Sequence, residues 1–272
     1  MKILFIGDVV GRPGRKAVHQ FLEENRKVYD FCILNGENAA GGFGLTEKIT
    51  KALLSYGADV ITGGNHTFDK KEIYQFIDKY PILRPANYPE GTPGKGFDIF
   101  EVNGKRILVI NLMGRVFVEC LDNPFRTFDR IVEEAEADVV VVDFHGEATS
   151  EKQAFGYYVD GRATAVFGTH THVQTADLRQ LPKGTLYITD AGMCGAVESV
   201  IGMGVEEGIF RFVKQLPVKF KVPEKPKLIQ FCGVSFEVDD KGNVTNFERI
   251  QEIYVRREDG SYIRREETIG KD

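Results

Sequence analysis

Three stretches decide the fold: KILFIGDVVG (residues 2–11), FCILNGEN (31–38) and DVITGGNH (59–66). Each begins with an apolar run and ends in glycine and polar side chains. Helix-like periodicity separates them, near residues 15–26 and 47–56. This strand–helix–strand rhythm is typical of a parallel sheet. We therefore expect parallel strands whose carboxyl ends gather the polar residues at one edge.

The rest of the chain continues the alternation. The pair Asn103-Gly104 predicts a tight hairpin, and Thr46, Asp69 with Glu72, and Gly57 are typical helix caps. We expect further helices near 70–80, 128–136, 150–158 and 208–215, strands at 97–102, 105–111, 138–144, 163–167 and 186–189, and a closing hairpin at 228–238 and 243–255. The charged end, 256–272, is expected to fray. The pattern favours one layered α/β domain, 1–272, with mixed sheets.

Composition excludes several classes of protein. The chain has 272 residues, of which 42% are hydrophobic, so it can bury a full core. Its net charge of -5 argues against a broad cationic surface that clamps nucleic acid, and no stable nucleic-acid complex is expected. No apolar run is long enough for a signal peptide or a membrane span, which predicts a cytoplasmic protein with no membrane partner. Four widely separated cysteines are interpreted as buried thiols.

Metal-ligating side chains follow five of the apolar runs. Four of the five histidines lie at such strand ends, and only His19 does not; we interpret His19 as structural. The oxygen donors at the same ends are Asp8, Glu37, Asn38 and Asn65, and the histidines are His66, His145, His170 and His172. The crevice outside strand carboxyl ends is where open α/β sheets bind ligands. These side chains are therefore expected to converge.

So many donors exceed the four of a structural zinc site. Two divalent metals about 3.5–4 Å apart can share them through one bridging carboxylate, and Glu37 is central in the set. Mixed imidazole and oxygen donors favour iron or manganese, with zinc as an alternative, over calcium. Asn38 is open to two interpretations, a ligand or a turn residue. Asp190 is interpreted as a strand-end turn with Gly192, the alternative being a carboxylate that orients a ligating imidazole.

The order of these motifs resembles the metallophosphoesterase superfamily. The matching residues are Asp8, Gly36-Glu37, Gly64-Asn65-His66, His145 and Gly168-Thr169-His170-Thr171-His172. Val10 replaces the histidine of the first motif, and Glu37-Asn38 replaces the usual bridging Asp. With these departures, the whole chain resembles the narrower group of YmdB-type bacterial phosphodiesterases.

The resemblance implies a four-layer αββα sandwich and a specific division of labour. It implies that Asp8, Glu37, Asn38 and His172 hold one metal and that Glu37, Asn65, His145 and His170 hold the other. His66 would be the general acid. The implied reaction is hydrolysis of a cyclic nucleotide of the 2′,3′ type by in-line attack of a metal-bridging hydroxide.

Other functions are weighed against this one. The same metal pair also suits a phosphomonoesterase or a nuclease for longer RNA. A regulatory nucleotide-binding protein with low turnover is less favoured, because His66 accompanies a nearly full ligand set. Two glycine-rich segments, 11–14 and 41–44, complete neither phosphate-binding fingerprint and are interpreted as turns that line the site. The sequence leaves open a homo-oligomer.

Overall fold

The computed structural model describes residues 1–265. Its first sheet has nine strands, and its central part runs in the order β15-β14-β13-β1-β3-β4-β5. β1, β3, β4 and β5 are parallel, whereas β13 joins β1 antiparallel. The bounds are β1 Lys2–Ile6, β2 Asp8–Val9, β3 Phe31–Asn35, β4 Val60–Thr62, β5 Ile82–Leu83, β12 Met193–Ala196, β13 Leu228–Val238, β14 Val244–Arg256 and β15 Tyr262–Arg264.

The second sheet has six strands in the order β10-β11-β9-β8-β7-β6. β7, β8, β9 and β11 are parallel, and the expected hairpin joins β6 to β7 antiparallel. The bounds are β6 Phe97–Val102, β7 Lys105–Met113, β8 Val139–His145, β9 Ala165–Thr169, β10 Arg179–Gln180 and β11 Leu186–Ile188. Both sheets are mixed, as predicted.

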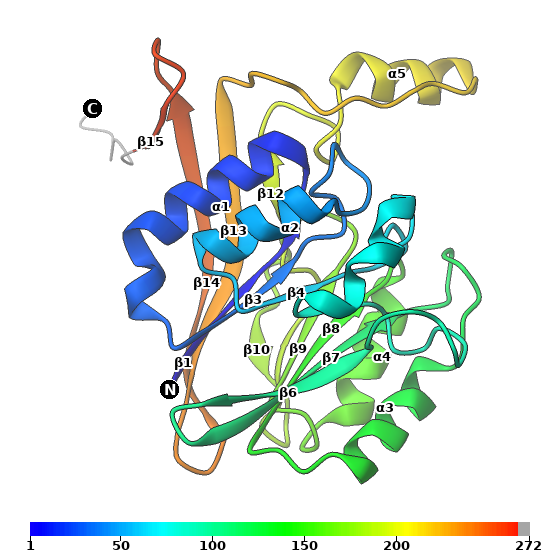
Figure 1. Ribbon diagram of the computed structural model, residues 1–272, viewed down its shortest axis with the longest axis vertical. Helices are drawn as coiled ribbons and strands as arrows, with labels where there is room; N and C mark the ends of the chain where they lie inside the picture. Colours follow the sequence, from blue (N-terminus) through cyan, green and yellow to red (C-terminus); the bar gives the residue numbers. More distant parts are fainter. Residues whose placement is uncertain (266–272) are drawn as a thin grey trace.

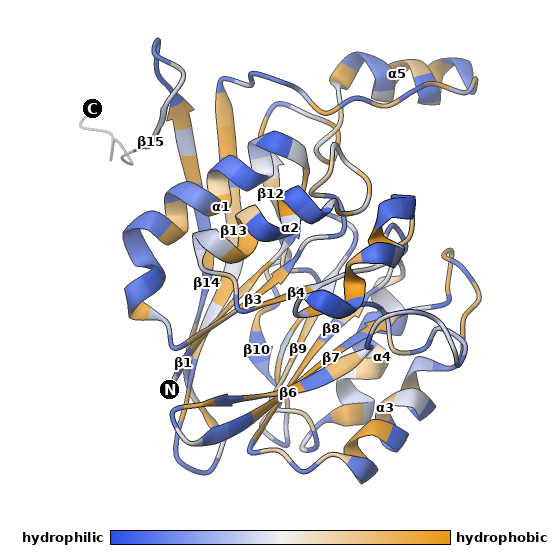
Figure 2. Ribbon diagram, viewed as in Figure 1, coloured by the Kyte–Doolittle hydropathy of each residue, from blue (hydrophilic) through white to orange (hydrophobic). Residues whose placement is uncertain are grey.

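Three apolar layers hold the sheets and helices together. One cluster joins the faces of the two sheets, where Phe5 of β1 packs on Phe167 of β9 with ring centroids 4.6 Å apart. The other two clusters lie under the helices: α1 (Gly11–Asn25) and α2 (Glu47–Tyr56) cover the first sheet, and α3 (Pro124–Glu134) and α4 (Thr149–Val159) cover the second. The αββα sandwich is confirmed (Figure 1), and its strands form the apolar interior in Figure 2.

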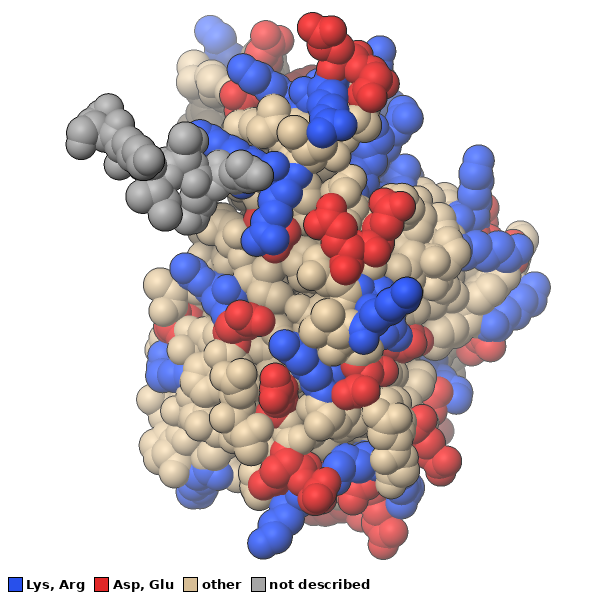
Figure 3. All heavy atoms as spheres, turned by 90° about the vertical axis from the view of Figure 1, so that its left-hand side faces the viewer, with Lys and Arg blue, Asp and Glu red and all other residues tan. Residues whose placement is uncertain are grey.

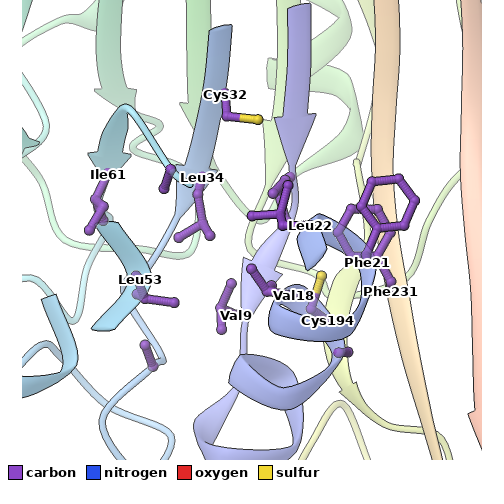
Figure 4. Close-up of a cluster of buried hydrophobic side chains, with 14 of the residues drawn as sticks. Val9, Val18, Phe21, Leu22, Cys32, Leu34, Leu53, Ile61, Cys194 and Phe231 are labelled. Atoms are coloured by element: carbon purple, nitrogen blue, oxygen red, sulfur yellow. The ribbon is translucent and has the colours of Figure 1, made fainter. Parts of the chain in front are cut away.

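Helix α1 shows how the outer layers are attached. Its buried residues recur at helical spacing and include Val18, Phe21 and Leu22. Phe21 stacks on Phe231 of β13 with ring centroids 3.8 Å apart, and Figure 4 shows both rings beside the sheet. Burial of each such side chain stabilises the fold by about 1.5–3 kcal/mol. The helix is therefore held firmly against β13 and the rest of the first sheet.

Several local predictions need correction. The segment near 70–80 forms two 3₁₀ turns, Lys71–Gln75 and Ile77–Lys79, and no α-helix. Asp69 caps nothing there, because its carboxylate contacts the His66 ring instead. By contrast, the Thr46 side chain accepts from the Ile49 amide, and Gly57 ends α2 with a left-handed backbone, as predicted. The segment 11–14 is the first turn of α1.

The end of the chain and the surface also differ in part from expectation. Residues 262–264 do not fray but form β15 on β14; the last seven positions of the predicted frayed end lie outside the described residues. Cys32, Cys194 and Cys232 are buried thiols, whereas Cys120 is exposed. In the described residues, no helix has the length and apolar character to cross a membrane. Acidic and basic side chains are interspersed on the face shown in Figure 3.

The last helix, α5 (Val205–Lys214), lies at the margin of the molecule, apart from both helical layers (Figure 1). Only Gly208 of this helix is buried. The helix was predicted, but its separation from the core was not.

Candidate metal centre

The polar residues predicted at the strand ends converge at the carboxyl edge of both sheets. Asp8 lies in β2 directly after β1, Glu37 and Asn38 follow β3, and Asn65 and His66 follow β4. From the second sheet, His145 ends β8, and His170 and His172 follow β9. The parallel strands all point toward this edge, so residues up to 164 positions apart in the chain meet there.

One group of donors surrounds His145. Its Nε2 lies 3.1 Å from Glu37 Oε1, 2.9 Å from Asn65 Oδ1 and 3.1 Å from His170 Nδ1. Ligand atoms of Glu37, His145 and His170 all lie within 4.8 Å of one another, which is close enough to share a metal ion. Gly64 makes this approach feasible, because a Cβ at that position would collide with the Glu37 carboxylate and the His145 ring.

A second group surrounds His172. Its Nε2 lies 3.2 Å from Asn38 Oδ1 and 3.8 Å from Asp8 Oδ1. Asp8 is fully buried, and among the described residues its Oδ1 has no hydrogen-bond partner. An unpaired buried carboxylate oxygen costs several kcal/mol unless a cation neutralises it. The donors therefore fit a divalent metal at this position.

The electrostatics of the cluster also fit bound cations. Burial raises the pKa of Asp8 to about 7. Burial also disfavours the Glu37 carboxylate, but the charge of His145 and the His66 amide lower the pKa of Glu37 to about 2. Burial disfavours the His145 imidazolium, yet Glu37 raises the pKa of His145 to about 9. Burial and then the charge of His145 lower the pKa of His170 to about 3. The carboxylates thus require positive charge, which a divalent ion supplies.

His66 is placed differently from the other histidines. Its amide donates to Glu37 Oε2 at 3.0 Å, but its ring lies at the edge of the cavity. Ring Nδ1 lies 2.9 Å from Asp69 Oδ2, and Phe43 packs edge-on at a centroid distance of 4.9 Å. Because Asp69 engages Nδ1, Nε2 is the ring nitrogen left for a ligand.

The loop that carries His170 and His172 has an unusual backbone. Both residues have positive φ, 99° and 66°, a region that costs a non-glycine residue about 1–3 kcal/mol. Asp8 Oδ2 accepts from the His170 amide at 3.1 Å, which opposes this strain. The ring Nδ1 of His172 also contacts the carbonyl oxygen of Ile201 at 2.8 Å.

A buried ion pair supports the same loop from below. Lys152 of α4 is 1% exposed, and its Nζ donates to Asp190 Oδ2 at 2.8 Å and to the Thr169 carbonyl at 2.7 Å. Asp190 Oδ2 also accepts from the amide of Thr171 at 3.0 Å and from its hydroxyl at 2.6 Å. Asp190 Oδ1 accepts from Gly192 as the turn interpretation predicted. Asp190 therefore forms the turn and also fixes the histidine loop, without touching an imidazole.

His145 is oriented by a second buried network. Its Nδ1 lies 2.9 Å from the Thr169 hydroxyl, which donates to Asp143 Oδ1 at 2.7 Å. Asn35 and Thr62 donate to the other Asp143 oxygen. Such outer contacts fix the ring of a metal-ligating histidine.

A cavity of about 400 Å³ opens onto these residues. Five predicted site residues line it: Glu37, Asn38, His66, His170 and His172. His19 lies elsewhere, on α1, in agreement with its structural interpretation.

Sequence reasoning missed four polar residues of the site: Asp69, Asp143, Glu147 and Lys152. Glu147 Oε2 lies 3.1 Å from His170 Nε2. Asp69 and Glu147 each follow a site histidine by two or three positions, which was a usable signal. Lys152 carried no such signal, because nothing in a helical sequence marks a buried lysine.

The comparisons with known proteins identify the family and the fold. A family model described as "YmdB-like protein" matches residues 4–250. A Bacillus subtilis protein named "2′,3′-cyclic-nucleotide 2′-phosphodiesterase" is 55% identical over 89% of this chain and 92% of its own length. The crystal structure of a novel phosphatase from Mycoplasma pneumoniae is 39% identical, covers 93% of each chain and has a TM-score of 0.88. A 5′-nucleotidase precursor from Thermus thermophilus, 14% identical with a TM-score of 0.54, covers 92% of this chain and 54% of its own and shares the fold alone.

Proposed function

The chain belongs to the YmdB-like family, and from this premise we propose that it is a two-metal phosphodiesterase that hydrolyses 2′,3′-cyclic nucleotides. The family expected from the motifs is confirmed, and its named relatives are phosphodiesterases and phosphatases, in agreement with the expected class of phosphoric-ester hydrolase. The observation that carries the proposal is the buried donor cluster, together with Asp8 Oδ1, which has no hydrogen-bond partner among the described residues and lies 3.8 Å from a ring nitrogen of both His145 and His172.

The two groups of donors define which residues would hold the metals. Glu37, Asn65, His145 and His170 surround one position, and Asp8, Asn38 and His172 surround the other, with Glu37 as the proposed bridge. Iron or manganese suits this mixture of imidazole and oxygen, and zinc is the alternative. When bound, such ions supply Lewis acidity and a water of lowered pKa. Asn38 Nδ2 donates to the Gly42 carbonyl, in agreement with the turn interpretation, and Asn38 Oδ1 lies beside His172, where we propose that it also serves as a ligand.

We propose that His66, which lines the cavity, transfers the proton and that Asp69, which contacts the His66 ring, supports it. In the hydrolysis, the oxygen of water forms a bond to phosphorus, and the bond from phosphorus to one ribose oxygen breaks. The departing ribose oxygen then needs a proton, which we assign to His66 Nε2. Asp69 orients the ring through its contact with Nδ1. Asp69 does not itself touch the substrate in this assignment, so it is a positioning residue.

The partners follow from the same cavity. A cyclic mononucleotide is small enough for about 400 Å³, which lies within the range of small-molecule pockets. The single domain, the cytoplasmic location, the lack of a stable nucleic-acid complex and the homo-oligomer stay predictions.

Hydrolysis of 2′,3′-cyclic AMP by metal-stripped protein, with and without added manganese, tests the proposal. We expect manganese-dependent turnover that His66→Ala lowers by about 100-fold or more without loss of bound metal. His19→Ala is the matched control, because His19 is an exposed histidine outside the cavity, and it should retain full rate. Turnover of phosphomonoesters or RNA alone would favour the other hydrolases, and no turnover with metal bound would favour a regulatory binding protein.

A further inference from the structure

The cavity beside the donor cluster has one side that the proposed chemistry does not use. The same cavity has an apolar wall, defined here as Phe43, Val200, Ile201, Met203, Phe212 and Phe220. None of these side chains carries a strong hydrogen-bond donor or acceptor. Five of the six come from one segment, residues 200–220.

This segment is anchored at its base to the donor cluster. The carbonyl of Ile201 contacts His172 Nδ1 at 2.8 Å, and Ile201 has a positive φ of 47°. A β-branched residue rarely adopts this backbone conformation, so its position is fixed by the surrounding contacts. The Gly204 amide also donates to the Lys221 carbonyl at 2.8 Å, which brings the two ends of the segment together. The apolar wall is therefore held at a defined place next to a proposed metal ligand.

Phe212 and Phe220 are not explained by core packing. Phe212 is 77% exposed and lies on α5, which buries almost nothing. Phe220 is half-buried and lies after α5, in the part of the segment that has no regular secondary structure. Large exposed aromatic side chains beside a polar site are typical of ligand contacts.

We propose that the apolar wall, with Phe212 and Phe220 as its aromatic surfaces, binds the nucleobase of the substrate. This inference rests on the proposed function and deepens it. A base has a flat apolar face that stacks on aromatic rings, whatever its hydrogen-bonding edge. Since the wall offers no polar group to that edge, the enzyme accepts all four bases with similar KM. The polar side of the cavity then receives the phosphate.

The test compares two substrates that share a five-membered cyclic phosphate: 2′,3′-cyclic AMP, and glycerol 1,2-cyclic phosphate, which has no base. In Phe212→Ala and Phe220→Ala, KM for 2′,3′-cyclic AMP should rise about tenfold with kcat nearly unchanged. Kinetics with glycerol cyclic phosphate should not change. Phe117→Ala is the matched control, because Phe117 is 88% exposed and does not line the cavity.

Equal effects on both substrates, or no effect on either, would overturn the nucleobase assignment. A KM that differs more than tenfold among the four 2′,3′-cyclic nucleotides would overturn base tolerance. If the native protein hydrolyses neither substrate, the proposed function fails, and calorimetric binding of 3′-AMP and of glycerol phosphate then tests the wall alone. Weaker binding of 3′-AMP only, in both phenylalanine variants, would still support the wall, and unchanged binding would refute it.

Discussion

The donor cluster and the apolar wall meet at one cavity but are built in opposite ways. The donor cluster comes from five strand ends, and Asp8, Glu37 and His145 are at most 1% exposed. The apolar wall comes mainly from one segment whose helix buries only Gly208. Chemistry needs donors fixed within a fraction of an ångström, whereas stacking tolerates looser placement. If the two proposed roles hold, the difference teaches that rate and affinity reside in separable parts of the molecule.

Glu37→Gln should have the largest effect, because it removes the carboxylate proposed to bridge both metals. We expect turnover to fall by roughly 1,000-fold or more, with loss of metal from both positions. Glu134→Gln on α3, an exposed glutamate far from the cavity, is the control. Elemental analysis together with kcat is the measurement. A variant that keeps two metals and full rate would contradict the claim that the donor cluster, through Glu37, supplies the rate.

Lys152→Met should affect both stability and rate. The substitution leaves Asp190 as an uncompensated buried charge, which costs about 3–5 kcal/mol in the free energy of unfolding. It also releases the loop of His170 and His172, so kcat should fall about 10- to 100-fold. The ratio of KM for 2′,3′-cyclic AMP to KM for glycerol 1,2-cyclic phosphate should stay constant. Denaturant unfolding and kinetics measure these effects. The control is Lys48→Met, at an exposed position of α2, which should change neither the stability nor the kinetics. Unchanged kinetics in Lys152→Met would show that the loop of His170 and His172 does not need the ion pair.

Asp69→Asn sharpens the assignment of the proton donor. The amide keeps the size of the side chain but replaces the carboxylate that contacts His66 Nδ1, so the ring is held less firmly. We expect kcat for 2′,3′-cyclic AMP to fall about tenfold with metal content unchanged. A loss of metal in this variant would instead make Asp69 part of the donor cluster.

Asp177→Asn should give the smallest effect. Asp177 accepts from the hydroxyl groups of Thr175 and Thr189, each at 2.6 Å, and although burial opposes ionisation these contacts lower its pKa. A lowered native pKa contributes stability above the unfolded pKa, and this stability is lost as pH falls through the native value. The variant should lose about 1–2 kcal/mol at neutral pH. Urea unfolding measured from pH 7 to pH 3 should show that the difference in free energy of unfolding between the variant and the native chain becomes smaller. A difference that stays constant would contradict this role of Asp177.

The two regions also differ in how far the sequence predicted them. The strand–helix alternation and the polar residues after glycine located the donor cluster, because strand ends in a parallel sheet must converge. Short strands such as β2 and β12 were not predicted, because a strand of two to four residues is too short to show a periodic pattern. The segment near 70–80 had helical spacing, but the contact of Asp69 with His66 removed its cap.

The apolar wall could not be predicted. The sequence indicated a helix near 208–215, but the apolar residues of a helix have the same spacing whether they face a core or a cavity. The contact between Ile201 and His172, 29 positions apart, and the shared cavity show that the segment belongs to the site. Long-range contacts of this kind leave no local pattern.

Manganese titration of metal-stripped protein, with hydrolysis of 2′,3′-cyclic AMP followed against metal bound per chain, tests the central claim most directly. We predict that turnover rises with bound manganese and reaches its maximum near two ions per chain, and that Glu37→Gln abolishes both. Full turnover in the stripped protein, or saturation with metal and no hydrolysis, would contradict a two-metal phosphodiesterase.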